Sequence, residues 1–332
     1  AAYAVDNIGR SIFMIDATSG ELLWSAAHNS SSGQNLSLPD MKNAFPGSPA
    51  VTDVDGDGLI DRFYIGDMGG RLWRFDIHNG ESENSLVTAG VVAKLGAGHL
   101  AAPAAATVHN RRFFERPDIS VSVDRDSGAA WMNISIGSGY RASPRNAEVE
   151  DHFYVIRDPY PYEVISDYSG YGWTLSDLTD LTNITTPELS ADSKGWYLRL
   201  VEPDSGDSSG FSGVGEKVLS KATTVDGAVM FTTFTPIPPP SGGSQCAVAA
   251  GYNRAYVISV KDGRPLLDLN EDSSDILQRS DRWQSLDSAG IAPGVVVLFD
   301  ENGDAAVFSG PEKIISPDVM LSGKTYWHEE EK

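Results

Sequence analysis

The stretch "DVDGDGLIDRFYIGDMGGRLWRFDI" (residues 53–77) joins an acidic loop to two runs of strand-forming residues. Its first nine residues hold four aspartates, at positions 53, 55, 57 and 61, with two glycines among them. The remainder consists of short aromatic and aliphatic runs bounded by Gly and Asp, which is typical of β-strands. Because strand-like residues flank the loop on both sides, the stretch predicts a β-hairpin rather than a helix–loop–helix.

The spacing of the aspartates predicts a metal site in this loop. In a D-x-D-x-D-G loop, the first, third and fifth carboxylates converge on one point, the glycine permits a sharp bend, and the next residue offers its backbone carbonyl. An EF-hand completes the shell with a glutamate five residues further on, where this chain has Tyr64, so we expect Asp61 to complete it instead. The predicted ligands are the carboxylates of Asp53, Asp55, Asp57 and Asp61 and the carbonyl of Leu59.

The predicted ion is Ca²⁺, because an all-oxygen shell with several carboxylates selects a hard cation and a flexible loop favours calcium over magnesium. A metal-free acidic turn is the alternative interpretation, but four crowded carboxylates repel one another without a compensating charge. A cation here can simply hold a long hairpin together, which is the default role. Regulation by occupancy of the site is the second role that we consider.

Outward from this loop, strand signals dominate the chain. Ten short runs are rich in β-branched and aromatic residues and end at Gly, Asp, Asn or Pro. They cover residues 11–16, 62–67, 71–76, 131–137, 152–158, 195–201, 228–234, 254–260, 294–300 and 305–310. Residues 174–183 form the best short helix candidate and 316–324 a weaker one. Three polar stretches, 28–40, 202–216 and 236–245, are predicted to be long inserted loops.

A weak internal repeat organises these strands. Residues 6–24 and 67–81 share an Asp, a Gly-Arg pair, an aromatic-rich strand ending in Asp and a Gly-containing turn, and 253–269 repeats the later part. Unequal spacing of the copies fits four-stranded blades with loop insertions better than a tight solenoid. The predicted fold class is therefore all-β, a modified β-propeller with long inserted loops, and a pair of β-sandwiches is the alternative. Trp24 and Trp73 are expected at comparable positions, as core wedges between blades.

Composition excludes several classes of function. The 332 residues carry 25 Lys+Arg against 46 Asp+Glu, a net charge of −21, which disfavours binding to nucleic acid and to anionic membranes. Cys246 is the single cysteine, so no intrachain disulfide can form. No apolar run is long enough for a transmembrane segment. None of the six histidines lies in a nucleophile elbow or at the i,i+4 spacing of a metal pair. Because these catalytic patterns are missing from the sequence, we predict a non-enzymatic protein.

The run at 53–77 resembles the calcium loop and following strands of the PilC/PilY family of type IV pilus biogenesis and tip-associated proteins. Residues 194–200, 215–236 and 323–331 resemble the C-terminal domain of that family in order and style. The resemblance implies a modified β-propeller and calcium ligands at Asp53, Asp55, Asp57, Asp61 and the Leu59 carbonyl. It further implies a cell-surface protein, at the pilus tip or outer membrane, that supports pilus assembly and opposes pilus retraction. The resemblance also implies that calcium occupancy tunes the balance between assembly and retraction. Minor pilins or the pilus tip are the implied partners, and a host or abiotic surface the implied attachment target.

Two features depart from the family pattern. The chain begins at what resembles the middle of the propeller, so we expect residues 1–332 to be the C-terminal propeller region of a larger protein whose N-terminal blades are missing here. Cys246 stands alone in a segment where relatives often carry further cysteines.

Two other propeller classes remain as alternatives. A quinone-dependent dehydrogenase has similar blade turns but often carries a vicinal disulfide, which one cysteine cannot form. An integrin-like propeller repeats its D-x-D-G-D-G-x-x-D loop in several blades, whereas this sequence has one full copy.

Overall fold

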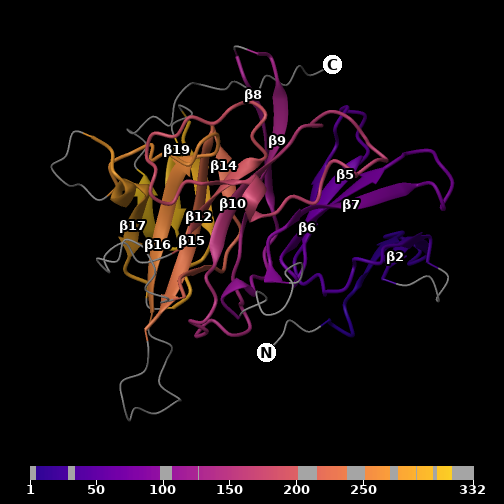
Figure 1. Ribbon diagram of the computed structural model, residues 1–332, viewed down its shortest axis with the longest axis horizontal. Coiled ribbons are helices and arrows are strands. Elements are labelled where there is room, and N and C mark those ends of the chain that lie inside the picture. The colour runs from indigo at the N-terminus through magenta and orange to yellow at the C-terminus, as the bar shows by residue number, and fades with distance from the viewer. Residues whose placement is uncertain are drawn as a thin grey trace, which may run out of the picture.

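The computed structural model is built from five β-sheets that follow one another in chain order (Figure 1). It describes residues 5–28, 34–97, 107–125, 127–200, 215–237, 251–269, 276–288, 290–301 and 305–315. Cys246, the helix candidate at 316–324 and the family-like segment at 323–331 lie outside these residues. In Figure 1 the sheets form a row from β2 on the right to β17 and β19 on the left.

The first two sheets have the strand orders β1-β2-β3 and β4-β5-β6-β7. Their strands are β1 (Ser11–Ile15), β2 (Leu22–Ala27), β3 (Leu36–Ser37), β4 (Ala50–Thr52), β5 (Arg62–Gly66), β6 (Arg71–Ile77) and β7 (Val87–Lys94). Consecutive strands pair antiparallel, except that the two-residue β3 runs parallel to β2. Every residue of β5 and β6 is buried, so these central strands are covered on both faces.

The third sheet has the strand order β11-β12-β10-β9-β8. Its strands are β8 (Asp118–Val123), β9 (Ala130–Gly137), β10 (His152–Asp158), β11 (Thr179–Asp180) and β12 (Gly195–Arg199). Two short 3₁₀ turns, η3 (Thr107–His109) and η4 (Leu175–Asp177), lie in its connections. The helix predicted over 174–183 is wrong: η4 is a single turn, and the chain then pairs with β12 through β11.

The fourth and fifth sheets have the strand orders β13-β15-β16-β17, with β14 also paired to β15, and β18-β19-β20. Their strands are β13 (Lys217–Val218), β14 (Thr223–Val225), β15 (Ala228–Pro236), β16 (Gly251–Ser259), β17 (Trp283–Leu286), β18 (Val295–Phe299), β19 (Ala305–Ser309) and β20 (Glu312–Ile315). The 3₁₀ turn η5 (Arg279–Arg282) precedes β17. The all-β class and all ten predicted strands are confirmed. Among the described residues, the helical segments are too short for any of them to cross a membrane.

Four hydrophobic clusters hold the row of sheets together, one between each pair of neighbours. Each central strand contributes side chains to two of these clusters, because successive side chains of a strand point to opposite faces of the sheet. On β10, Tyr154 and Ile156 pack toward the second sheet, whereas Phe153 and Val155 pack toward the fourth. Each inner sheet is therefore covered on both faces by its neighbours, which is how blades of a propeller stabilise one another.

The internal repeat has a structural counterpart in its turns. Gly9 and Gly70 precede β1 and β6 with φ of 73° and 70°, a left-handed conformation that glycine adopts without steric cost. A Cβ on Gly70 would also lie 2.6 Å from the Cα of Gly96 and would collide with the backbone there. Trp24 and Trp73 lie on non-equivalent strands, β2 and β6, contrary to the prediction of comparable positions. Both are buried in the cluster between the first and second sheets, so their predicted role as core wedges is confirmed.

Candidate metal centre

The acidic loop at 53–61 connects β4 to β5 in the second sheet. The two strands pair antiparallel up to the partners Thr52 and Arg62, and the amide of Asp61 donates to the carbonyl of Thr52 at 3.1 Å. The ends of the loop are therefore fixed by the sheet ladder. The predicted hairpin is confirmed, and the residues between its ends are held by their own side chains.

Asp53 is the centre of the loop's hydrogen bonds. One of its carboxylate oxygens accepts the amide of Gly56 at 2.7 Å, and the other accepts the amide of Gly58 at 2.8 Å. The chain must curl around Asp53 to make both bonds, and it does so through positive φ angles of 80° at Gly56 and 89° at Gly58. The two glycines of the motif thus serve the bend that the sequence predicted.

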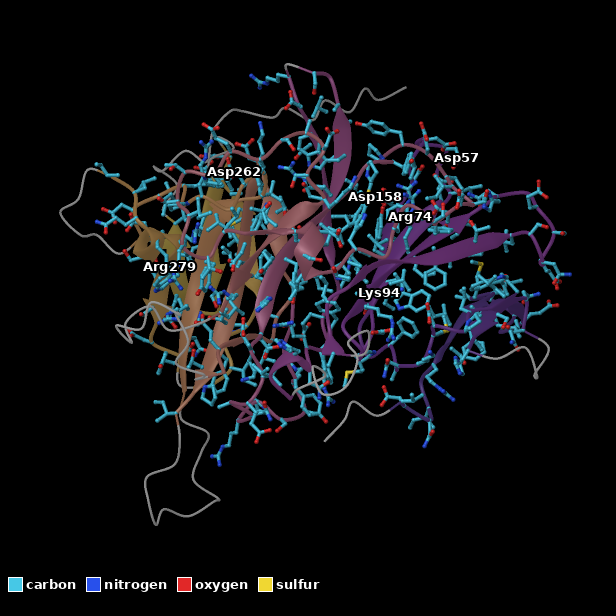
Figure 2. The ribbon with its side chains drawn as sticks, in the orientation of Figure 1. Asp57, Arg74, Lys94, Asp158, Asp262 and Arg279 are labelled. Carbon is cyan, nitrogen blue, oxygen red and sulfur yellow. The ribbon has the colours of Figure 1, made fainter. Side chains whose placement is uncertain are left out.

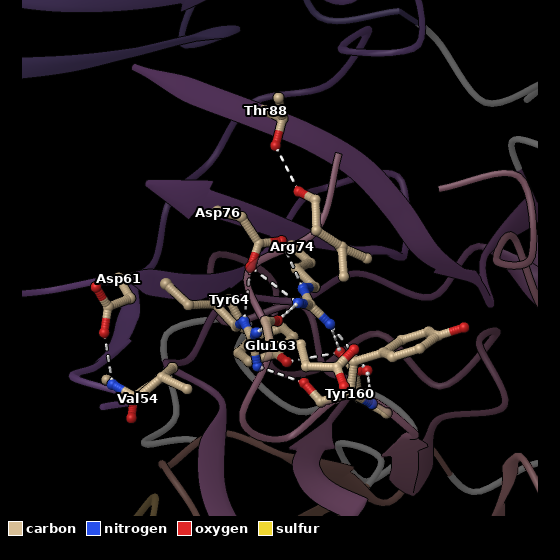
Figure 3. Close-up of polar contacts among 12 residues, drawn as sticks. Val54, Asp61, Tyr64, Arg74, Asp76, Thr88, Tyr160 and Glu163 are labelled. Carbon is tan, nitrogen blue, oxygen red and sulfur yellow. Dashed lines mark hydrogen bonds and ion pairs between the residues drawn. The ribbon is translucent and has the colours of Figure 1, made fainter. Parts of the chain in front are cut away.

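Asp61 closes the loop from its far end. It is 6% exposed, and its Oδ2 accepts the amide of Val54 at 2.7 Å, a contact drawn in Figure 3. Its Oδ1 accepts the side-chain amide of Asn79 at 2.9 Å, and the same amide lies 3.3 Å from the carbonyl of Ile60. The sequence analysis missed Asn79, because it lies in the turn after β6 and no spacing rule of the acidic motif includes it.

Three of the predicted ligands come together in this arrangement. Asp53, Asp55 and Asp61 each offer a carboxylate oxygen, and these oxygens lie within 4.8 Å of one another. Asp57 lies outside this group, and its Oδ1 accepts the amide of Leu59 at 2.7 Å. Three converging carboxylate oxygens could hold a metal ion, and oxygen-only donors suit a hard cation.

A buried network of charged side chains begins at the residue after Asp61. The Arg62 guanidinium donates to Asp76 at 2.9 Å and to the carbonyls of Tyr160 at 2.8 Å and Glu163 (Figure 3). Arg62 and Asp76 have fully buried side chains. The acidic loop therefore ends one residue before an arginine that fixes the 160–163 loop of the third sheet against the second.

Arg74 extends the same network between the second and third sheets. It donates to Asp76 at 2.6 Å and to Asp158 at 2.8 Å, and Tyr64 donates to Asp158 at 2.6 Å. Burial alone would lower the pKa of Arg74, but Asp76 and Asp158 raise it above its ordinary value. Burial, aided by the charge of Asp158, raises the pKa of Tyr64 well above its ordinary value, so Tyr64 remains a donor. Figure 2 shows Arg74 and Asp158 next to each other between the two sheets.

Comparison with known proteins gives one curated relative and a matching fold. No protein-family model matches the sequence. The chain is 28% identical over 230 residues to the type IV pilus biogenesis factor PilY1 homolog of Xylella fastidiosa (strain Temecula1), an alignment that covers 65% of this chain and 14% of that protein's length. Its fold matches the crystal structure of the Pseudomonas aeruginosa PilY1 C-terminal domain with a TM-score of 0.59 at 16% identity, covering 92% of this chain and 66% of that one. The resemblance predicted from the sequence is thus confirmed: the chain is similar in sequence to a PilY1 homologue and in fold to the PilY1 C-terminal domain.

Proposed function

We propose that this chain is the C-terminal β-propeller region, residues 1–332, of a larger type IV pilus biogenesis factor, and that it acts without enzymatic activity at the cell surface. The observation that carries the proposal is the agreement of two independent comparisons, a sequence match to a PilY1 homologue and a fold match to a PilY1 C-terminal domain. Its proposed partners are the minor pilins or the pilus tip, and its proposed attachment target is a host or abiotic surface.

The proposal includes a Ca²⁺ ion in the 53–61 loop. Asp53, Asp55 and Asp61 supply converging carboxylates, and Asp57 and the Leu59 carbonyl, from the same loop, complete the proposed ligand set. The amides of Gly56 and Gly58 and the side chain of Asn79 already orient these carboxylates. Pre-orientation favours binding, because less conformational freedom is lost when the ion arrives.

Calcium in this loop would stabilise the β4–β5 hairpin by preferential binding to the folded state. At a free concentration of 100 times Kd, such binding contributes about 3 kcal/mol to the free energy of unfolding. Because Asp61 adjoins Arg62, the ion would also stiffen the start of β5, from which Arg62 reaches the third sheet. Through this effect we propose that occupancy shifts the balance between pilus assembly and retraction.

Calcium binding can be tested on the purified chain. Isothermal titration should give a calcium site with much weaker binding of magnesium, and Asp53→Asn and Asp61→Asn should each abolish it. Asp16→Asn is a matched control, because Asp16 also accepts two turn amides, those of Thr18 and Ser19, but lies outside the carboxylate group. Equal melting temperatures in chelator and in millimolar calcium would contradict the metal site.

The cellular role is tested in the full-length protein. Asp53→Asn and Asp61→Asn are introduced together, and surface pili and twitching motility are counted with and without calcium. The expected result is fewer pili, or motility that no longer responds to calcium, with normal amounts of the protein. Unchanged piliation and motility would contradict the proposed role of calcium. The same result together with quinone-dependent dye reduction by the purified chain would contradict the pilus function and favour the dehydrogenase instead.

A further inference from the structure

Asn79 and Gly80 form the middle of an exposed turn that follows β6. The amide of Glu81 closes this turn and donates to the carbonyl of His78 at 3.1 Å. Gly80 has a φ of 88°, and a Cβ placed on it would meet nothing within 4 Å. The other Asn-Gly pair of the sequence, 302–303, lies outside the described residues, so Asn79 is the one described asparagine that a glycine follows.

An Asn-Gly pair can react with itself in water. The backbone nitrogen of Gly80 attacks Cγ of Asn79 and closes an imide ring. The bond from Cγ to the side-chain nitrogen breaks, and that nitrogen leaves as ammonia with the proton of the Gly80 amide. Water then adds to one of the two imide carbonyls and breaks its bond to the Gly80 nitrogen. The product is aspartate or, when the main-chain carbonyl is attacked, isoaspartate, and water is the sole co-reactant.

Two features of this turn favour ring closure. Glycine has no side chain beside the attacking nitrogen, so the approach is less hindered than at any other residue that could follow asparagine. Both Asn79 and Gly80 are exposed, and the Gly80 N–H has no backbone acceptor among the described residues. Water can therefore reach the N–H whose proton must be lost.

A contact with the acidic loop opposes the reaction. The side-chain nitrogen of Asn79 donates to Oδ1 of Asp61 at 2.9 Å and lies 3.3 Å from the carbonyl oxygen of Ile60. The nitrogen that has to leave is thus the atom that makes both contacts. Both contacts must break before ammonia can depart, so the hydrogen bond to Asp61 should slow the reaction in the folded protein.

Conversion of Asn79 would reverse the character of this contact. A carboxylate oxygen would replace the nitrogen that now donates to Asp61, and two negative groups would face each other. Asp61 is 6% exposed, so water screens this repulsion less than it does at a fully exposed site. The bond from the Val54 amide to Asp61, which closes the acidic loop, would then compete with repulsion from residue 79.

We propose that Asn79 is a site of spontaneous deamidation, that its hydrogen bond to Asp61 slows the reaction, and that the aspartate product weakens the closure of the acidic loop. The proposal goes beyond the pilus function and does not depend on calcium. For that reason its test is carried out in the presence of a calcium chelator.

The test is peptide mapping by mass spectrometry after incubation of the purified chain in mildly alkaline buffer. We expect aspartate and isoaspartate to accumulate at residue 79, while Asn146, which an alanine follows in an exposed turn, remains an amide. Asp61→Ala should raise the rate at residue 79 at least about tenfold, because a hydrogen bond to a charged acceptor shifts an equilibrium by that factor or more. Asp57→Ala is the matched control, since Asp57 lies in the same loop but accepts the amide of Leu59, and it should leave the rate unchanged.

The effect of the product on the loop is measured with Asn79→Asp. In chelator this variant should melt at a lower temperature than Asn79→Ala, because repulsion from Asp61 adds to the loss of the hydrogen bond. Asn146→Asp adds the same charge at an asparagine of another turn and should melt close to the unmodified protein.

Three results would overturn the proposal. An intact amide at residue 79 in the unmodified protein and in Asp61→Ala, when the urea-unfolded chain is converted, would show that the turn prevents ring closure. Equal rates in the two folded proteins would show that Asp61 gives no protection. An Asn79→Asp variant that melts at or above the temperature of Asn79→Ala would show that the product does not repel Asp61. If Asp61→Ala fails to fold, Asp61→Asn, which keeps a neutral acceptor, takes its place and should still react faster than the unmodified protein.

Discussion

Arg74 of β6 and Asp158 of β10 belong to different sheets, yet one terminal nitrogen of the arginine lies 3.0 and 2.8 Å from the two oxygens of the aspartate. Both side chains are fully buried. The hydroxyls of Tyr64 and Tyr171 donate to the same carboxylate, each at 2.6 Å. A hydrophobic cluster alone would tolerate small slips between the second and third sheets, whereas this pair fixes their relative position.

We expect Asp158→Asn to destabilise the protein strongly. The substitution leaves the shape of the side chain but removes one of the two carboxylates, Asp76 and Asp158, that balance the buried Arg62 and Arg74. One buried positive charge is then left without a counterion, which costs about 3–5 kcal/mol. Urea denaturation followed by tryptophan fluorescence measures the loss as a lower midpoint.

The matched control for that substitution is Glu115→Gln, which breaks the partly exposed ion pair of Glu115 with Arg141 at 3.0 Å. Exposed pairs contribute about 0–1 kcal/mol, so this variant should remain close to the unmodified protein. Equal effects of the two substitutions would contradict the structural role of the Arg74–Asp158 pair.

Close contact between the third and fourth sheets depends on Gly137 at the end of β9. A Cβ at this position would lie 2.3 Å from the Cβ of Val218 on β13. Because a Cβ is attached directly to the backbone, a change of side-chain rotamer cannot remove this clash. Gly137→Ala should therefore separate the sheets and cost about 1–3 kcal/mol or more, as overpacking does. Thermal unfolding followed by circular dichroism measures the effect.

Gly170→Ala provides the comparison, because a Cβ there would meet nothing within 4 Å. That variant should melt within a few degrees of the unmodified protein. If Gly137→Ala melted equally high, the contact between β9 and β13 would be looser than the structure indicates.

Asp151 gives a prediction about pH. It is buried, its Oδ1 accepts the Ser138 hydroxyl at 2.7 Å, and its Oδ2 has no partner among the described residues. Burial raises the pKa of Asp151 in the folded protein to about 6, above the value of about 3.9 for an unfolded chain. Between these two values the folded state binds more protons than the unfolded state, so this contribution to stability is lost as pH rises from about 4 to about 6.

Asp151→Asn should remove that part of the pH dependence, because the amide stays neutral throughout. We expect the variant to gain stability relative to the unmodified protein as pH rises from 4 to 6.5, measured by urea denaturation in metal-free buffer. Asp67, whose pKa burial also raises to about 6, is present in both proteins, so the difference isolates Asp151. Parallel stability curves over this range would contradict the raised pKa. The exposed Asp268→Asn is the control and should give parallel curves.

The sequence predicted the central strands and the acidic hairpin because both depend on neighbouring residues. Runs such as 152–158 combine aromatic and β-branched side chains and are buried on both faces, and β10 has those same bounds. Strand β7 (Val87–Lys94) was missed because Gly90 interrupts its pattern. The structure explains that glycine, since a Cβ there would lie 2.4 Å from the ring of Tyr168.

The buried charge network could not be predicted from the sequence. Arg74 and Asp158 are 84 residues apart, and nothing local to either residue indicates the partner. An available signal was the presence of Arg62, Arg74 and Asp76 within otherwise apolar strands, because a buried charge needs a counterion. The acidic loop could be predicted in part, because its aspartates follow a local spacing rule. Asn79 could not be predicted, because it contacts Asp61 only once the chain has folded.

Substitution of Asn79 tests whether a residue that is not a proposed ligand supports the acidic loop. Its side-chain amide donates to Asp61 at 2.9 Å and so orients a carboxylate that is proposed to bind calcium. Loss of such a supporting contact typically lowers metal affinity about 10- to 100-fold. Asn79→Ala should therefore weaken calcium binding by about tenfold in isothermal titration and reduce the rise in melting temperature at a fixed, subsaturating calcium concentration. Asn146→Ala, which removes an asparagine that caps an exposed turn through the amide of Glu148, should leave calcium affinity unchanged. Equal affinities in the two variants would show that Asp61 does not need Asn79 to be positioned, or that Asp61 does not bind the ion.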